Sequence, residues 1–167
     1  MKLPKYSLPE IERRWLVHAW YLDELDQLPC RIIEDVYIDG SLLRLRHIRE
    51  ANGETVYKLC KKYGRRDTLS NPITNIYLSP EEYLALSVLP GSRVIKHRHS
   101  VAGGAVDLYA ASPALAIFEI DFEFEREAAG YLPPPFAGEE VTDNPAYTGA
   151  ALALRFTART GEHTLGP

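Results

Sequence analysis

The sequence is poor in cysteine and has no long apolar run. Cys30 and Cys60 are its two cysteines, too few for a disulfide framework, and no CxxC or Cys/His pair is spaced like a zinc site. No stretch approaches the ~18 uninterrupted apolar residues that a membrane-spanning helix needs. The first residues, MKLPKYSLPEIERRWLV, carry charges where a signal peptide would have its apolar core. We therefore expect a reduced, soluble, cytoplasmic protein.

Repeats, linkers and low-complexity segments are also missing. The chain of 167 residues is 46% hydrophobic and 25% charged, a globular composition that argues against wholesale disorder. Its 23 Asp and Glu exceed its 19 Lys and Arg, giving a net charge of −4, and this mild acidity disfavours a nucleic-acid partner. A chain of this length suits one domain. We expect that domain to cover residues 1–155, with a flexible tail at 156–167.

Much of the chain alternates between apolar and polar residues, which is the period of a half-buried strand. Asp39-Gly40 and Asn52-Gly53 are turn signals between such segments. Helix signals are fewer: Ser79-Pro80-Glu81-Glu82 resembles a capped helix start, and a second short helix is expected from Asn144-Pro145. The pattern predicts a mainly β (α+β) antiparallel domain. The expected strands are residues 10–17, 31–38, 41–49, 55–63, 73–78, 93–99, 105–109 and 115–125.

Charged residues are segregated by strand. Period-two geometry gives three strands a pair of positive charges on one face, one strand a row of carboxylates, and the first strand both signs. Such rows can be the solvated outer faces of a sandwich. Like charges in a row repel, however, and they are more easily tolerated when a ligand of opposite sign lies between them. The residues in these rows are Glu10, Glu12, Arg14, Arg44, Arg46, Lys58, Lys62, Lys96, Arg98, Glu119 and Asp121.

If the strands close into a barrel with these faces inward, the interior suits a polyanion together with a divalent cation. Guanidinium groups pair with phosphate oxygens through two parallel hydrogen bonds, and lysines act on them as point charges. Carboxylate oxygens are the ligands that Mg²⁺ and Mn²⁺ prefer. The sequence therefore predicts a short phosphate chain, such as triphosphate or another polyphosphate, as the ligand.

The segment Glu10-Ile11-Glu12-Arg13-Arg14 resembles the N-terminal ExExK signature of the CYTH superfamily, the triphosphate tunnel metalloenzymes. That superfamily includes class IV adenylyl cyclases, thiamine triphosphatases and inorganic triphosphatases. The resemblance continues in order over residues 8–153, nearly the whole chain. The further matching segments are 43–46 (LRLR), 57–62 (YKLCKK), 79–83 (SPEEY), 96–98 (KHR), 106–109 (VDLY), 118–121 (FEID) and 140–142 (EVT).

The resemblance implies an eight-stranded antiparallel β-barrel that forms a tunnel, in a monomer or homodimer that does not bind membranes. It implies a metal-dependent phosphohydrolase, using Mg²⁺ or Mn²⁺, that cleaves inorganic triphosphate or an organic triphosphate. Catalytic roles fall on Arg14 and Glu140. Metal ligation falls on Glu10, Glu12, Asp107, Glu119 and Asp121. Phosphate binding falls on Arg14, Arg44, Arg46, Lys58, Lys62, Lys96 and Arg98.

Three departures from the family pattern leave alternatives open. Arg14 replaces the signature lysine, and a guanidinium cannot accept a proton. Residues 71–76 lack the charged residues usual at that strand, and Asp121 replaces a longer Glu. A phosphate-binding protein without turnover, or an enzyme that cyclises ATP to cAMP, are the alternatives.

Overall fold

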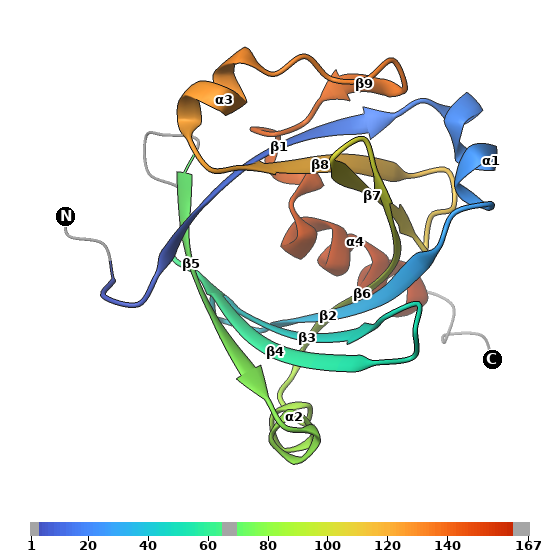
Figure 1. The fold of residues 1–167 in the computed structure, drawn as a ribbon. Helices are drawn as coiled ribbons and strands as arrows, with labels where there is room; N and C mark the ends of the chain where they lie inside the picture. The colour runs from blue at the N-terminus through green and yellow to red at the C-terminus, as the bar shows by residue number, and fades with distance from the viewer. Residues whose placement is uncertain (1–3, 65–69, 162–167) are drawn as a thin grey trace.

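The computed structural model describes residues 4–64 and 70–161, and its centre is a closed barrel of antiparallel strands (Figure 1). Around the ring the order is β5-β4-β3-β2-β6-β7-β8-β1, and β1 pairs with β5 to close it. The predicted eight-stranded barrel is confirmed. Its strands are β1 (Leu8–Val17), β2 (Cys30–Ile38), β3 (Leu43–Arg49), β4 (Thr55–Lys62), β5 (Ser70–Leu78), β6 (Gly91–Val101), β7 (Gly104–Tyr109) and β8 (Ala116–Phe122).

Strand β1 is the seam of the barrel because it pairs with three neighbours in succession. Its first part pairs with β5, its middle with β8, and its end with the short outer strand β9 (Ala137–Glu140). The middle pairing places Glu12 opposite Asp121 and Arg14 opposite Glu119. Residues directly opposite in a ladder share a face, so the acidic and mixed rows meet on one side of the sheet.

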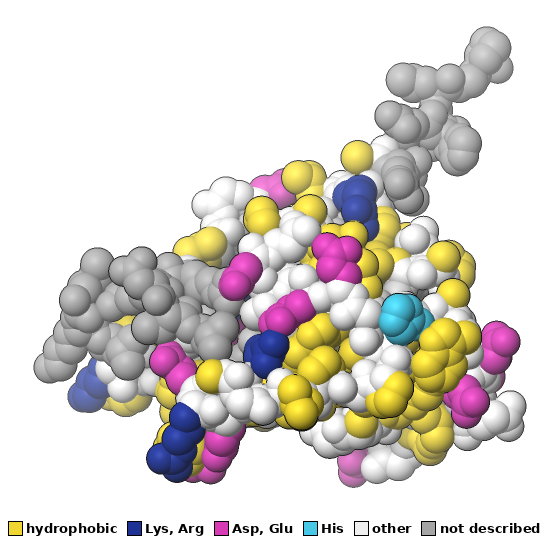
Figure 2. All heavy atoms as spheres, turned by 90° about the horizontal axis from the view of Figure 1, so that it is seen from above, with side chains coloured by type: hydrophobic (Ala, Val, Ile, Leu, Met, Phe, Trp, Pro, Cys, Tyr) yellow, Lys and Arg dark blue, Asp and Glu magenta, His cyan; other side chains and the backbone are white. Residues whose placement is uncertain are grey.

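The remaining registers place the positive rows on the same inner face. Arg46 lies opposite Asp35 in the β2–β3 pair, and Arg98 lies opposite Asp107 in the β6–β7 pair. Asp35 is 1% exposed and Asp107 is fully buried, so these rows point into the barrel. The outer face over α3 and β9 instead mixes apolar side chains with charges of both signs (Figure 2).

Apolar residues pack on both sides of the barrel wall. Outside, Trp15 and Phe118 form a cluster with Leu25 and Phe136 from the segments that cover the wall. The helical segments of the chain are η1 (Ala19–Tyr21), α1 (Leu22–Leu25), α2 (Pro80–Leu86), α3 (Glu125–Gly130), η2 (Pro145–Tyr147) and α4 (Gly149–Gly161). None of the described helices is long and apolar enough to cross a membrane.

Helix α4 lies within the outline of the ring when the barrel is viewed along its axis (Figure 1). Its Leu152 and Phe156 pack with Val94, Tyr109 and Ile117 of the strands. These strand residues alternate with outward-facing neighbours and share the face of the charged rows. The helix therefore closes one end of the barrel with an apolar layer, and the charged interior is left beyond it.

Two sequence boundaries differ from the structure. The strand expected at 115–125 ends at Phe122, and α3 begins at Glu125. The helix expected near Asn144 is a short η2 followed by α4, which runs to Gly161, past the expected domain end at 155. Phe156 is 3% exposed, and its spacing from Leu152 forms one apolar helix stripe. Residues 162–167 of the expected tail lie outside the described residues.

Candidate functional site

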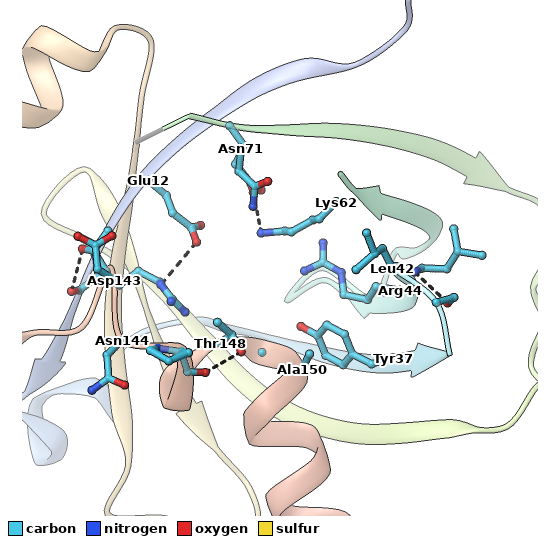
Figure 3. A pocket seen from close by; sticks show the side chains of 17 residues that line it. Glu12, Tyr37, Leu42, Arg44, Lys62, Asn71, Asp143, Asn144, Thr148 and Ala150 are labelled. Atoms are coloured by element: carbon cyan, nitrogen blue, oxygen red, sulfur yellow. Dashed lines mark hydrogen bonds and ion pairs between the residues drawn. The ribbon is translucent and has the colours of Figure 1, made fainter. Parts of the chain in front are cut away.

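A cavity of about 350 Å³ opens inside the barrel at the start of α4 (Figure 3). One part of its wall is charged and comes from β1, β3 and β4. The other part comes from Tyr37, from the loop before β3, and from residues 142–150. The charged lining residues are Glu10, Glu12, Arg14, Arg44, Lys62 and Asp143, and the others include Tyr37, Leu42, Leu43, Asn71, Thr142, Pro145, Thr148 and Ala150.

The three cations of this cavity were all predicted as phosphate ligands, and each lies beside an acid or a carbonyl. Lys62 Nζ is 2.6 Å from Glu10 Oε2. Arg14 Nη1 donates to the Tyr147 carbonyl at 2.8 Å, and its Nε lies 3.5 Å from Glu12 Oε1. Burial would lower the pKa of Lys62, but the charges of Glu12 and Glu10 outweigh it and raise that pKa. The cavity thus holds positive charge at neutral pH.

Asp35 is a buried acid of the barrel interior that sequence reasoning missed. It accepts hydrogen bonds from Arg46 Nε at 2.6 Å and Arg46 Nη2 at 2.7 Å, and Arg44 Nε lies 3.8 Å away. Burial would raise the pKa of Asp35, but Arg46 and Arg44 hold it well below its usual range. The alternation of strand 31–38 could have placed Asp35 and Tyr37 on one face. Its partner depends on the register with the next strand.

Asp107 braces a second pair of cations. It accepts from Arg98 Nε at 2.6 Å and Arg98 Nη2 at 2.8 Å, and it also pairs with Lys96. Arg98 reaches Glu119 as well. Burial would raise the pKa of Asp107, but Lys96 and Arg98 hold it low. Asp107, expected to bind a metal, thus has both oxygens engaged by cations, and Lys96 and Arg98 do not line the cavity.

The carboxylates of β1 and β8 form the remaining part of the interior. The pKa of Asp121 is raised to about 6, first by partial burial and then by the charges of Glu12, Glu119 and Glu10. This mutual repulsion and the oxygen donor set fit a hard divalent cation. Within residues 4–64 and 70–161, no three Asp, Glu, His or Cys side chains converge as a metal site. Glu10, Glu12 and Glu119 are each drawn instead toward a cation.

Lys58 and Glu140 are predicted site residues that do not line the cavity and lie apart from the interior ion pairs. Lys58 Nζ lies over the Tyr77 ring, 4.8 Å from its centroid. Glu140 accepts from Arg13 Nε at 2.8 Å and Nη2 at 2.6 Å, and from Thr142 Oγ1 at 2.7 Å. Arg13 alternates with the inward residues of β1, so this pair lies on the outer side. Glu140 thus anchors the segment before α4 to β1.

Comparison with known proteins gives one curated relative. No protein-family model matches the chain. An inorganic triphosphatase of Nitrosomonas europaea is 33% identical over 159 residues, covering 88% of this chain and 98% of that protein. A solved structure described as the hypothetical protein NE1496 is 24% identical with a TM-score of 0.50, over 87% of this chain and 97% of that one. A second, of the inorganic triphosphatase NE1496, is 23% identical with a TM-score of 0.49, over 86% and 97%.

Proposed function

We propose, from the premise that this chain belongs to the CYTH (triphosphate tunnel) family, that it hydrolyses a phosphoanhydride bond of inorganic triphosphate or an organic triphosphate. The relative that establishes the family is named an inorganic triphosphatase, and the chain covers nearly all of it. Phosphoanhydride hydrolysis is thus the reaction that this similarity supports.

The cavity is the observation that carries the proposal. Arg14, Arg44 and Lys62 line it together with Glu10 and Glu12, so cations and carboxylates face one enclosed volume. Guanidinium and ammonium groups bind phosphate oxygens through charge-assisted hydrogen bonds. A phosphate chain is the small-molecule class that needs both charge types in one site, because it arrives with a divalent cation.

The carboxylates would hold that cation. Glu10, Glu12, Glu119 and Asp121 are the residues that would bind Mg²⁺ or Mn²⁺, which offsets negative charge on phosphate oxygens. Because burial and the neighbouring carboxylates raise the pKa of Asp121 to about 6, this ligand loses its proton as the pH rises through 6. Cation binding should therefore strengthen as the pH rises through 6.

The cavity cations would position the phosphate chain of the substrate and offset the negative charge that develops on the leaving group. Phosphoryl transfer depends chiefly on such positioning and electrostatics. Arg14 would hold the substrate through its charge and its hydrogen bonds to phosphate oxygens. Asp35 and Asp107 fix Arg46, Lys96 and Arg98 before substrate arrives, so little reorganisation is needed.

A phosphate-release assay tests the proposal. The wild-type protein is given Mg²⁺ or Mn²⁺ with inorganic triphosphate, thiamine triphosphate or ATP. Glu10→Gln/Glu12→Gln should reduce release by about 100-fold or more, whereas Glu139→Gln, on exposed β9, should not change it. Undiminished release from the double variant would remove the assignment. Tight binding without release would indicate a phosphate-binding protein, and cAMP formed from ATP would indicate a cyclase.

A further inference from the structure

The first turn of α4 forms one wall of the cavity. This helix has thirteen residues, and Thr148, Gly149 and Ala150 at its start line the cavity. Thr148 caps the helix, since its Oγ1 accepts from Ala151 N at 3.2 Å and its carbonyl accepts from Leu152 N at 2.9 Å. The N–H groups of Gly149 and Ala150 precede the first intrahelical bond, and no acceptor for them occurs among the described residues. Two residues of the cavity wall, Gly149 and Ala150, therefore have N–H groups without an acceptor among the described residues.

The start of α4 is held in place against both arginines of the cavity. Arg14 Nη1 donates to the carbonyl of Tyr147, two residues before the helix. On the other side, Tyr37 hydrogen-bonds with Arg44. The Tyr37 hydroxyl packs so closely on Gly149 that a Cβ there would lie 1.9 Å from it. The helix start and the two guanidinium groups thus form one rigid surface.

The two arginines each carry a buried donor that lacks a hydrogen-bond acceptor. The Arg14 side chain is 10% exposed, and among the described residues neither its Nε nor that of Arg44 has a hydrogen-bond partner. The nearest carboxylate oxygens, on Glu12 and Asp35, lie at 3.5 and 3.8 Å, too far for hydrogen bonds. A buried donor left unpaired costs free energy. Figure 3 shows Arg44 pointing into the same cavity that Thr148 and Ala150 line.

From this convergence we infer that the start of α4 binds one terminal phosphoryl group of the substrate. The N–H groups of Gly149 and Ala150, with the guanidinium groups of Arg14 and Arg44, donate to its oxygens. A helix N-terminus favours anions through its free N–H groups and its dipole. Because the body of α4 fills this end of the barrel, a phosphate chain cannot continue past it, and only a chain end fits. The inference rests on the proposed function and specifies which part of the substrate the helix holds.

A pair of substitutions at residue 150 tests the role of the backbone donor. Proline is tolerated in the first turn of a helix, and Gly149 has no Cβ to clash with it, so Ala150→Pro removes one N–H and keeps the helix. Ala150→Val adds similar bulk at this exposed position and keeps the N–H. We expect the Kd for imidotriphosphate, measured by calorimetry with Mg²⁺, to be about tenfold higher for Ala150→Pro than for Ala150→Val.

A second pair, at residue 148, keeps the inference testable if the proline variant does not fold. Asp and Asn both cap helices at least as well as Thr, so Thr148→Asp and Thr148→Asn should melt at or above the wild-type temperature. The carboxylate of Thr148→Asp would repel a phosphoryl group at the helix start, so we expect its Kd to exceed that of Thr148→Asn by about tenfold.

The outcomes separate this inference from the proposed function. Equal affinities within each pair, with phosphate release by the wild-type protein intact, would overturn the inference alone. A wild-type protein that neither binds imidotriphosphate nor releases phosphate from triphosphate would overturn both. Weaker binding by Ala150→Pro than by Ala150→Val, and by Thr148→Asp than by Thr148→Asn, with all four variants folded, supports the inference.

Discussion

Arg46 and Asp35 face each other across the β2–β3 pair and form a two-pronged ion pair, with Nε at 2.6 Å and Nη2 at 2.7 Å from the carboxylate. Arg98 and Asp107 repeat this arrangement across β6–β7. The interior cations therefore fall into two groups. Arg46 and Arg98 are braced by buried acids, whereas Arg14, Arg44 and Lys62 line the cavity and can reach a ligand.

Removing Asp35 should destabilise the fold strongly. Asp35→Ala leaves Arg46 buried without its counter-charge, and breaking such a pair costs about 3–5 kcal/mol. Urea unfolding measures the loss. Glu34→Ala is the matched control on the neighbouring residue, because Glu34 pairs with the exposed Arg93 at 3.2 Å and such surface pairs contribute about 1 kcal/mol or less. Similar losses in the two variants would show that the buried pair is not structural.

Neighbouring lysines on β4 should differ in their effect on ligand binding. Lys62 lines the cavity, whereas Lys61 faces outward with its Nζ over the Tyr63 ring. Lys62→Gln should weaken binding of inorganic triphosphate by about tenfold, because a charge-assisted contact is lost. Lys61→Gln should leave the Kd unchanged. Calorimetric titration of both variants checks this, and an equal effect would indicate attraction by overall charge in place of a defined site.

The raised pKa of Asp121 gives a pH dependence of stability. The folded protein binds this proton up to about pH 6, whereas an unfolded Asp releases it near pH ~4. The stabilisation that protonation provides is complete below pH ~4 and is lost as the pH rises through 6. Relative to Asp121→Asn, the wild-type protein should therefore lose stability between pH ~4 and 6.

Melting temperatures of the two proteins across that pH range measure the effect. Adding Glu12→Gln to both proteins should narrow the pH range over which the stability difference changes. Among the neighbouring charges, that of Glu12 raises the pKa of Asp121 the most. A constant difference in melting temperature from pH ~4 to 7 would contradict the repulsion among these carboxylates.

Gly149→Ala should destabilise the protein, although the same change usually stabilises a helix by about 0.5–1 kcal/mol. The new Cβ would lie 1.9 Å from the Tyr37 hydroxyl, and such overpacking costs about 1–3 kcal/mol. Denaturant unfolding gives the sign of the change. Tyr37→Phe removes the nearest atom and should recover part of the loss, and a Gly149→Ala protein more stable than wild type would refute the contact.

The direction in which charged side chains point could be predicted from sequence, because alternation along a strand is a local property. Glu10, Glu12 and Arg14 share the inner face as their spacing indicates. The pairing of Arg46 with Asp35 could not be predicted, since it depends on a register between two strands. For the same reason the sequence did not separate braced cations from cavity cations.

The sequence also did not predict which way Glu140 points or where α4 ends. Glu140 does not share the inner face of β1. It lies on the outer side of the barrel wall, where its carboxylate pairs with Arg13. Phe156 falls in the expected tail, and its burial against the strands becomes evident only from the barrel interior that it covers. Tertiary packing, and not local propensity, decides where this helix ends.

Helix α4 comes after every barrel strand in the chain, and its apolar side chains cover Val94, Tyr109 and Ile117. All eight barrel strands are therefore synthesised before the helix that closes one end of the barrel. Until then these three residues meet water, and the ring is hollow at that end. Barrels built from distant strand pairs fold slowly, and a chain cut before residue 149 should expose this apolar end and aggregate more readily than the full chain.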